Sequence, residues 1–165
     1  MIILALGANL PHPRFGTPLA ACEAALGELE GHGIRVIKRS RWYRSSPLPP
    51  SAQPDYVNGV VVVETALSPA SLLAELHTIE AAFGRVRGEP NAARTLDLDL
   101  IAYDGRVSQG GRGEPVLPHP RLSERAFVLL PLREVAPAWR HPASGRTLAE
   151  LIAALPAEAA ATPLA

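Results

Sequence analysis

The chain is poor in cysteine, with only Cys22 among its 165 residues. One cysteine excludes a disulfide within the chain and is typical of a reducing compartment, so we expect a cytoplasmic protein. The chain also lacks an apolar run long enough to cross a membrane, so we expect no membrane partner. Its apolar start, MIILALGANL, has no basic flank and predicts a buried strand rather than a signal peptide.

Excess charge of either sign is missing as well, since 16 basic side chains balance 16 acidic ones. Three phenylalanines and three tyrosines are few for a base-stacking surface, and the RNP1 pattern is absent. We therefore expect no nucleic-acid partner, although a non-enzymatic RNA-binding module stays open as an alternative. Lys38 is the only lysine, which leaves the chain rich in arginine, a side chain that can hold phosphate through two hydrogen bonds.

Several common site motifs are also absent. The five histidines form no HExxH motif and no Cys/His spacing typical of zinc ligands. Neither of the two common phosphate-binding loops occurs, GxxxxGK[ST] or GxGxxG after a strand. The sequence therefore argues against a zinc site and against a nucleotide site built on either loop.

Hydrophobic periodicity in the sequence predicts alternating strands and helices. The predicted strands cover residues 2–6, 34–43, 55–65 and 94–105, and the predicted helices lie near residues 19–29 and 69–83. The β-α-β-β-α-β order predicts an α+β fold, a ferredoxin-like βαββαβ sandwich with helices packed on an antiparallel sheet. The length predicts one domain, residues 1–165, with residues 156–165 as a frayed tail.

Local signals mark the ends of some helices. Ser68, followed by proline, predicts the start of the second helix, and Gly84 is expected to end it. Residues 104–118 are Gly-rich and predicted to be irregular. A helical C-terminal extension is expected from a stretch near 123–131 and from the capping-box pattern TLAE at 147–150.

The stretch RTLDLDLIAYDG, residues 94–105, alternates leucine with aspartate. Side chains two apart in a strand share a face, so Asp97 and Asp99 are predicted on one face and the leucines on the other. By itself a DxD pattern is common and indicates no more than a solvated face of a half-exposed strand. Two carboxylates side by side also suit a hard cation such as Mg²⁺, which binds a few carboxylate oxygens, water and substrate phosphates.

Arginines close to this pair support a phosphate-handling site. Arg85, Arg87 and Arg94 shortly precede the aspartates and lie partly in a predicted loop. Surface salt bridges would also explain the cluster, at about 0–1 kcal/mol each. The combination of cation ligands and arginines fits phosphoryl-type transfer, in which both neutralise the charge of a polyphosphate.

Two further groups of residues suit a flat ring and an anion. Tyr56 and Asn58 are two apart in a predicted strand, so a ring that could stack lies beside a carboxamide that could pair with the edge of a heterocycle. An ordinary strand with a packed tyrosine is the alternative. In LPHPRLSERAF, His119 lies between prolines and precedes Arg125 and Phe127, although a lone histidine is more often structural.

Taken together, these segments resemble the 6-hydroxymethyl-7,8-dihydropterin pyrophosphokinase family. The likeness runs from LALGANL through YRSSPL, QPDYVN and GRVR…RTLDLDLI to LPHPRLSERAF and PLREVAP, over residues 1 to about 155. The resemblance implies a ferredoxin-like fold, two Mg²⁺ ions, ATP as co-substrate and a pterin substrate. It also implies an ATP-dependent diphosphotransferase that passes diphosphate from ATP to the pterin hydroxymethyl group and releases AMP, in folate biosynthesis.

The resemblance also implies a role for individual residues. Asp97 and Asp99 would bind both magnesium ions. The pterin ring would lie between Tyr56 and Phe127, with Asn58 on its polar edge. The remaining pterin contacts would come from Ser45, Ser46, Pro47 and Leu48. ATP would be held by Glu80, Arg85, Arg87, Arg94, Leu100, His119 and Arg125, and Arg85 and Arg94 would be the catalytic residues.

The sequence departs from the family in the loop before Arg94. Relatives usually read Trp-Gly-Pro-Arg there, whereas this chain has Asn91, Ala92 and Ala93 before the arginine. The missing tryptophan normally helps to close a lid, so closure, affinity or rate is expected to differ. A metal-dependent phosphohydrolase that consumes ATP without pterin, and an inactive homologue, stay open as alternatives. We expect small-molecule substrates and a monomer.

Overall fold

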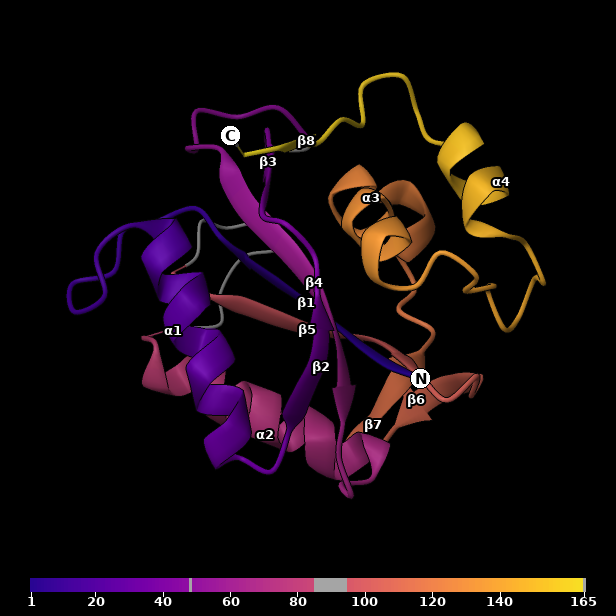
Figure 1. Cartoon of the computed structure of the whole chain (residues 1–165), viewed down its shortest axis with the longest axis horizontal. Coiled ribbons are helices and arrows are strands. Elements are labelled where there is room, and N and C mark those ends of the chain that lie inside the picture. The colour runs from indigo at the N-terminus through magenta and orange to yellow at the C-terminus, as the bar shows by residue number, and fades with distance from the viewer. Residues whose placement is uncertain (48, 85–94, 165) are drawn as a thin grey trace.

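The computed structural model describes residues 1–47, 49–84 and 95–164, and within them a six-stranded sheet carries helices on both faces (Figure 1). The strands of this sheet are β1 (Ile2–Ala8), β2 (Arg35–Arg39), β3 (Tyr43–Ser45), β4 (Tyr56–Glu64), β5 (Asp97–Tyr103) and β8 (Thr162–Pro163). The helices are α1 (Pro18–Gly31), α2 (Pro69–Ala82), α3 (Ala126–Val135) and α4 (Leu148–Ala153), with a 3-10 turn, η1 (Leu122–Glu124), before α3.

The strand order confirms the predicted α+β, ferredoxin-like fold. The sheet has the order β5-β1-β4-β3-β8, with β2 also paired to β4, and every pairing is antiparallel. Helix α1 connects β1 to β2 across β4, and α2 connects β4 to β5 across β1, which gives the split βαβ units of this fold. As a result β1 and β4 lie next to each other inside the sheet, and β5 lies beside β1 at one edge.

The strand predicted over residues 34–43 is divided into two in the structure. Both β2 and β3 pair with β4, one after the other along its length. Between them, the Oγ of Ser40 accepts a hydrogen bond from the backbone N–H of Val60 at 3.0 Å, in place of a backbone carbonyl of a regular strand pair. The pairing register also shifts between Val36 and Lys38. These local features divide what the apolar pattern indicates as one strand.

Capping residues fix both helices of the first layer. Thr17 accepts a hydrogen bond from the N–H of Ala20 at the start of α1, and Ser68 accepts one from Ser71 at the start of α2. Helix α2 ends at its cap, Phe83, and Gly84 follows with a φ of +81°, a conformation that glycine adopts at low cost. The predicted start of α2 is therefore confirmed, and Gly84 is the residue just beyond its cap.

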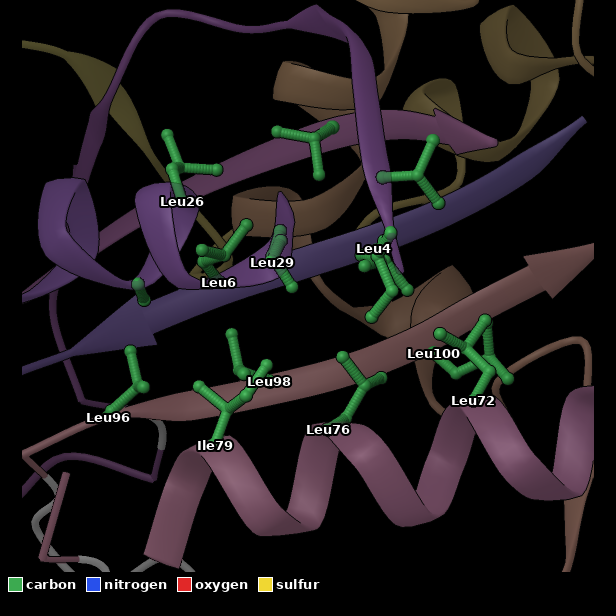
Figure 2. Packing of buried hydrophobic residues seen from close by; sticks show 14 of the residues in the cluster. Leu4, Leu6, Leu26, Leu29, Leu72, Leu76, Ile79, Leu96, Leu98 and Leu100 are labelled. Atoms are coloured by element: carbon green, nitrogen blue, oxygen red, sulfur yellow. The ribbon is translucent and has the colours of Figure 1, made fainter. Parts of the chain in front are cut away.

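Two hydrophobic clusters hold the layers together, one on each face of the sheet. On one face, leucines of β1 and β5 pack against α1 and α2 (Figure 2). On the other face, Ile3, Val60 and Ile101 pack against α3 and α4, so the helical C-terminal extension covers the second side of the sheet. Successive residues of β1 and β5 therefore face different helix layers.

Two predictions about loops are wrong in the described part of the chain. Residues 104–118 contain a hairpin rather than an irregular loop, formed by β6 (Ser108–Gly111) and β7 (Glu114–Leu117). The chain turns there through residues with positive φ, most of which are glycines. The predicted frayed tail, 156–165, instead contains β8, which pairs with β3. Over residues 1–47, 49–84 and 95–164, no helix is long and apolar enough to span a bilayer.

Candidate active site

The floor of the candidate site is formed by three neighbouring strands, β5, β1 and β4. Gly7 of β1 lies opposite Asp97 of β5 on one side and opposite Asn58 of β4 on the other. A Cβ atom at Gly7 would lie only 3.0 Å from Asn58 Oδ1, which is tighter than ordinary contact. Glycine therefore leaves an open floor between a carboxylate and a carboxamide that come from distant parts of the chain.

The two aspartates lie on the face opposite the leucines, as the alternation predicted. Leu98 and Leu100 are buried in the cluster shared with α1 and α2 (Figure 2). Asp97 and Asp99 are half-buried. Between the aspartates, the N–H of Leu98 donates to Oε2 of Glu80 at 2.8 Å. Glu80 is itself only 2% exposed, so a buried carboxylate of α2 fixes the backbone that carries the pair.

Arg125 brings a positive charge to the aspartates. Its guanidinium group lies 3.4 Å from Oδ2 of Asp99 and 5.4 Å from the centre of the Phe127 ring. The side chain of Arg125 is largely buried, which makes this ion pair less screened by solvent than a surface pair. Helix α3, which begins after Arg125, thus delivers both an arginine and an aromatic ring to the site.

Two hollows meet at this point. The larger, of about 640 Å³, includes Tyr56, Asn58 and Phe127 in its lining, and the smaller, of about 380 Å³, includes Glu80 and His119. Among the described residues, those that line both hollows are Asp97, Asp99 and Arg125. Two ligands bound in the two hollows would therefore approach each other at the paired carboxylates.

Asn58 is held in one orientation by its neighbours. Its Nδ2 donates to Oγ of Ser45 at 2.7 Å, and both side chains are buried. Ser45 itself is not among the residues that line the larger hollow, so it orients Asn58 from behind. Ser46 and Pro47, the residues that follow it, do line the hollow.

His119 lies in the smaller hollow as an uncharged imidazole. Burial lowers its pKa to about 4, and the positive charge of Arg125 adds to this shift, against a smaller opposite effect of Asp97. Its Nδ1 accepts the backbone N–H of Arg121 at 3.1 Å, which assigns the proton of the neutral ring to Nε2. Nε2–H is therefore a hydrogen-bond donor suited to an anionic ligand.

The carboxylates of Asp97 and Asp99 suit a metal ion that takes its remaining ligands from water and from the phosphates of a bound substrate. No group of three or more histidine, cysteine, aspartate or glutamate side chains is arranged to hold a metal within residues 1–47, 49–84 and 95–164. Two carboxylates beside two hollows fit Mg²⁺, because this ion keeps water and substrate phosphates among its ligands.

The structure brings most of the residues predicted for the site together. Those that line one or both hollows are Ser46, Pro47, Tyr56, Asn58, Glu80, Asp97, Asp99, Leu100, His119, Arg125 and Phe127. Ser45 is the described residue that lies behind this lining. The predictions for Leu48, Arg85, Arg87 and Arg94 fall outside the described residues.

Sequence reasoning missed several residues of the larger hollow. Arg121 lines it and stands inside the conspicuous segment LPHPRL, so that motif was the available signal. Gln53 also lines it, and the buried Asn9 donates to Gln53 Oε1 at 3.0 Å. Glu158 and the two residues after it line the hollow too, although nothing in their local sequence indicates it.

Comparison with known proteins gives matches over most of the chain. The family model for 7,8-dihydro-6-hydroxymethylpterin-pyrophosphokinase (HPPK) matches residues 3–137. A 2-amino-4-hydroxy-6-hydroxymethyldihydropteridine pyrophosphokinase of Synechocystis is 44% identical over 151 residues, 91% of this chain and 73% of the relative. The enzyme of the same name from Pseudomonas aeruginosa is 41% identical over 158 residues, 95% of this chain and 93% of the relative.

Solved structures give the same fold. The crystal structure of Plasmodium falciparum HPPK-DHPS with pteroate matches with a TM-score of 0.65 at 12% sequence identity, over 91% of this chain. This chain spans 41% of the length of that protein, and at such identity the likeness speaks for the fold alone. With the family model matched over residues 3–137 and relatives above 40% identity, this chain belongs to the 7,8-dihydro-6-hydroxymethylpterin-pyrophosphokinase family.

Proposed function

We propose that in this pyrophosphokinase of folate biosynthesis the larger hollow binds 6-hydroxymethyl-7,8-dihydropterin and the smaller hollow binds ATP. The observation that carries the proposal is that both hollows are lined by Asp97, Asp99 and Arg125. A reaction between two substrates needs their reacting atoms to meet in one place, and the shared residues mark that place. Diphosphate transfer takes place beside the two carboxylates.

The larger hollow offers what a pterin ring needs. Tyr56 and Phe127 are aromatic side chains that can cover the two faces of a flat ring. Asn58, held by Ser45, offers a fixed carboxamide to the edge of the heterocycle. Backbone groups near Ser46 and Pro47 supply further contacts, and Leu48 joins them by its likeness to the family.

The smaller hollow offers donors to the phosphates of ATP. Nε2–H of His119 and the guanidinium group of Arg125 bind phosphate oxygens. Leu100 and Glu80 lie toward the nucleoside, and Glu80 also holds the backbone of β5. Arg85, Arg87 and Arg94 complete the ATP site by likeness to the family, with Arg85 and Arg94 stabilising the charge that develops during transfer.

Asp97 and Asp99 would hold two Mg²⁺ ions together with the phosphates of ATP. Bound there, magnesium neutralises polyphosphate charge, which lowers the barrier to attack by an oxygen nucleophile. The support in this chain is the pair of half-buried carboxylates on one strand face, which repel each other unless a cation lies between them.

The reaction joins the hydroxymethyl oxygen of the pterin to the β-phosphorus of ATP. The bond between the β-phosphorus and the oxygen that bridges to the α-phosphorus breaks, AMP leaves, and the hydroxyl proton passes to solvent. The neutral state of His119 makes it a hydrogen-bond donor near neutral pH rather than a charged acid. Positioning and charge neutralisation therefore account for most of the rate enhancement, without a strong base.

Product analysis tests this assignment. We expect Mg-ATP with 6-hydroxymethyl-7,8-dihydropterin to give AMP and the pterin diphosphate, and no AMP to form without the pterin. Asp97→Asn should lower kcat by about 10²–10³-fold, the usual cost of losing one group that stabilises developing charge. Glu64→Gln, an exposed carboxylate at the far end of β4, is the matched control and should leave kcat unchanged.

The outcomes separate the competing functions. ADP or inorganic phosphate formed without pterin would favour a phosphohydrolase at the same carboxylates. No turnover, with pterin still bound, would indicate an inactive homologue. AMP formation that survives Asp97→Asn at the wild-type rate would overturn the assignment of the carboxylates.

We also propose a cytoplasmic monomer with one catalytic domain. The large apolar side chains exposed in the described residues are Met1, Ile37, Val107 and Val116, and so few are normal for a protein surface without a large apolar interface. ATP as co-substrate and the single, buried Cys22 suit the cytoplasm.

A further inference from the structure

The C-terminal segment that we call the strap, residues 156–164, is attached to the edge of the sheet. Its strand β8 pairs antiparallel with β3, with Pro163 opposite Tyr43 and Thr162 opposite Arg44. The N–H of Leu164 also donates to the carbonyl of Trp42 at 2.9 Å. Figure 1 shows this end of the chain lying beside β3, so the strap covers a strand edge that would otherwise be open.

The strap is held at its beginning as well. Leu155, the residue before it, packs against the cluster beneath α3 and α4. A turn follows, in which the N–H of Ala159 donates to the carbonyl of Pro156 at 3.0 Å. Because both ends are attached, the residues between them have a defined path across the molecule.

That path runs along the larger hollow. Continuing the antiparallel register of β8 and β3 by two or three residues takes Ala160 and Ala159 toward Ser46 and Pro47. All four of these residues line the larger hollow, and so does Glu158. The strap therefore forms a wall next to the segment that follows β3.

The side chains of this wall have two physical consequences. Ala159 and Ala160 are small and leave room in the hollow, which a larger side chain would fill. Glu158 adds a carboxylate to a stretch of the lining that also contains Asp55 and Glu124 among the described residues. Negative charge on a ligand next to Glu158 is therefore disfavoured relative to a neutral group at the same place.

We propose that the strap is a specificity-determining wall of the pterin site, in which the alanines set the space for the ring and Glu158 selects against anionic pterins. The inference rests on the proposed function, because it takes the larger hollow to be the pterin site. The strap lies beyond residues 3–137, the part of the chain that the family model matches.

The role of the alanines in leaving space for the pterin ring is tested by comparing Ala160→Phe with Ala157→Phe. Both alanines are exposed and belong to the strap, but Ala157 does not line the hollow. We expect Ala160→Phe to raise the Kd of 6-hydroxymethylpterin by about tenfold, as an overfilled site does. The Kd of a non-hydrolysable Mg-ATP analogue and the melting temperature should not change. Equal pterin affinity in the two variants would overturn the role of the alanines.

The role of the Glu158 charge in selecting against anionic pterins is tested by comparing Glu158→Gln with Glu64→Gln. Fluorescence titration with two pterins measures the binding. We expect Glu158→Gln to tighten binding of the anionic pterin-6-carboxylate by about threefold, the usual size of one screened charge contact. Binding of neutral 6-hydroxymethylpterin should change less, and the gain should shrink in high salt. An equal effect on both pterins, or none, would overturn the role of Glu158.

The wild-type protein separates this inference from the function on which it rests. Pterin-dependent AMP formation with unaltered pterin affinity in the strap variants would overturn the inference alone. A wild-type protein that binds no pterin would overturn the proposed function and this inference together.

Discussion

His119 illustrates how one side chain can be tuned by its surroundings at the residue scale. It lies between two prolines, and its backbone N–H donates to the carbonyl of Ile101 at 2.8 Å, which fixes it to β5. Burial and the nearby Arg125 lower its pKa to about 4. The ring thus offers an uncharged N–H donor in the hollow that we propose for the phosphates of ATP.

This low pKa predicts a pH-dependent stability. An unfolded histidine titrates near 6.5, so as the pH falls from 6.5 toward 4 the unfolded chain binds the proton and the folded chain does not. The contribution of His119 is therefore fully present above about pH 6.5 and is lost as the pH falls to about 4. The loss should be on the order of 2 kcal/mol after allowance for partial exposure.

Denaturation of the metal-free protein at pH 7 and pH 4.5 measures this effect. Wild-type protein should lose about 2 kcal/mol more of its free energy of unfolding than His119→Gln does. The difference between the two proteins removes the contribution of every other titrating group. A direct NMR titration of His119 serves if the variant does not fold, and a pKa near 6.5 would contradict the prediction.

At the scale of single elements, the sequence predicts those whose signals are local. The leucine and aspartate alternation of β5 is confirmed, because a strand with one buried face requires it. The capping box of α4 is confirmed, with Thr147 accepting from the N–H of Glu150 and the Glu150 side chain accepting in return. The start of α2 at Ser68 is confirmed for the same reason.

Elements formed by distant pairing are not predictable in this way. Strand β8 exists because Thr162 and Pro163 lie beside β3, and a strand of two residues that includes a proline carries no local signal strong enough to predict it. The hairpin of β6 and β7 is hidden by glycines, which read locally as a loop. The same limit applies to the site, since the sequence indicates Asn58 and Asp97 separately, but only the register through Gly7 brings them together.

Hydrogen bonds to Glu134 join α3 to β3 and to the residues just before it. Glu134 of α3 accepts the hydroxyl hydrogen of Tyr43 and the backbone N–H of Arg41, the latter at 2.9 Å. Burial alone would raise the pKa of Glu134, but the hydrogen bonds from Tyr43 and Arg41 hold it below its ordinary value. The carboxylate thus ties the C-terminal helix layer to the strand that carries Ser45.

Removing one hydroxyl group tests this tie. Tyr43→Phe should lower the free energy of unfolding by about 1.5–3 kcal/mol, the net contribution of one hydrogen bond to a charged group. The cost should shrink as the pH falls through the lowered pKa of Glu134, because a protonated carboxyl accepts a weaker hydrogen bond. Urea denaturation at pH 7 and pH 3.5 measures the cost of Tyr43→Phe in free energy of unfolding at each pH. A cost that does not depend on pH would argue against an ionised Glu134 as the acceptor.

At the scale of the whole molecule, the three layers leave two hollows that share one wall. The α1 and α2 layer contributes Glu80 to the smaller hollow, and the α3 and α4 layer contributes Phe127 to the larger. The shared wall carries two carboxylates and one arginine. Occupation of one hollow therefore changes the electrostatic potential in the other, even where neither layer moves.

This arrangement predicts that the two substrates bind cooperatively. If the proposed sites are right, a Mg-ATP analogue would bring cations to Asp97 and Asp99, which would reduce the repulsion between these carboxylates and fix Arg125 at the boundary of the larger hollow. We expect the Kd of 6-hydroxymethylpterin to fall by about 5- to 100-fold when the analogue is bound, and the Kd of the analogue to fall by the same factor when the pterin is bound. Calorimetric titrations in both orders measure the two factors. Asp99→Asn or removal of Mg²⁺ should reduce the coupling toward one, because the shared charge is what links the hollows, whereas coupling that persists at full size without Mg²⁺ would require a moving segment to carry it.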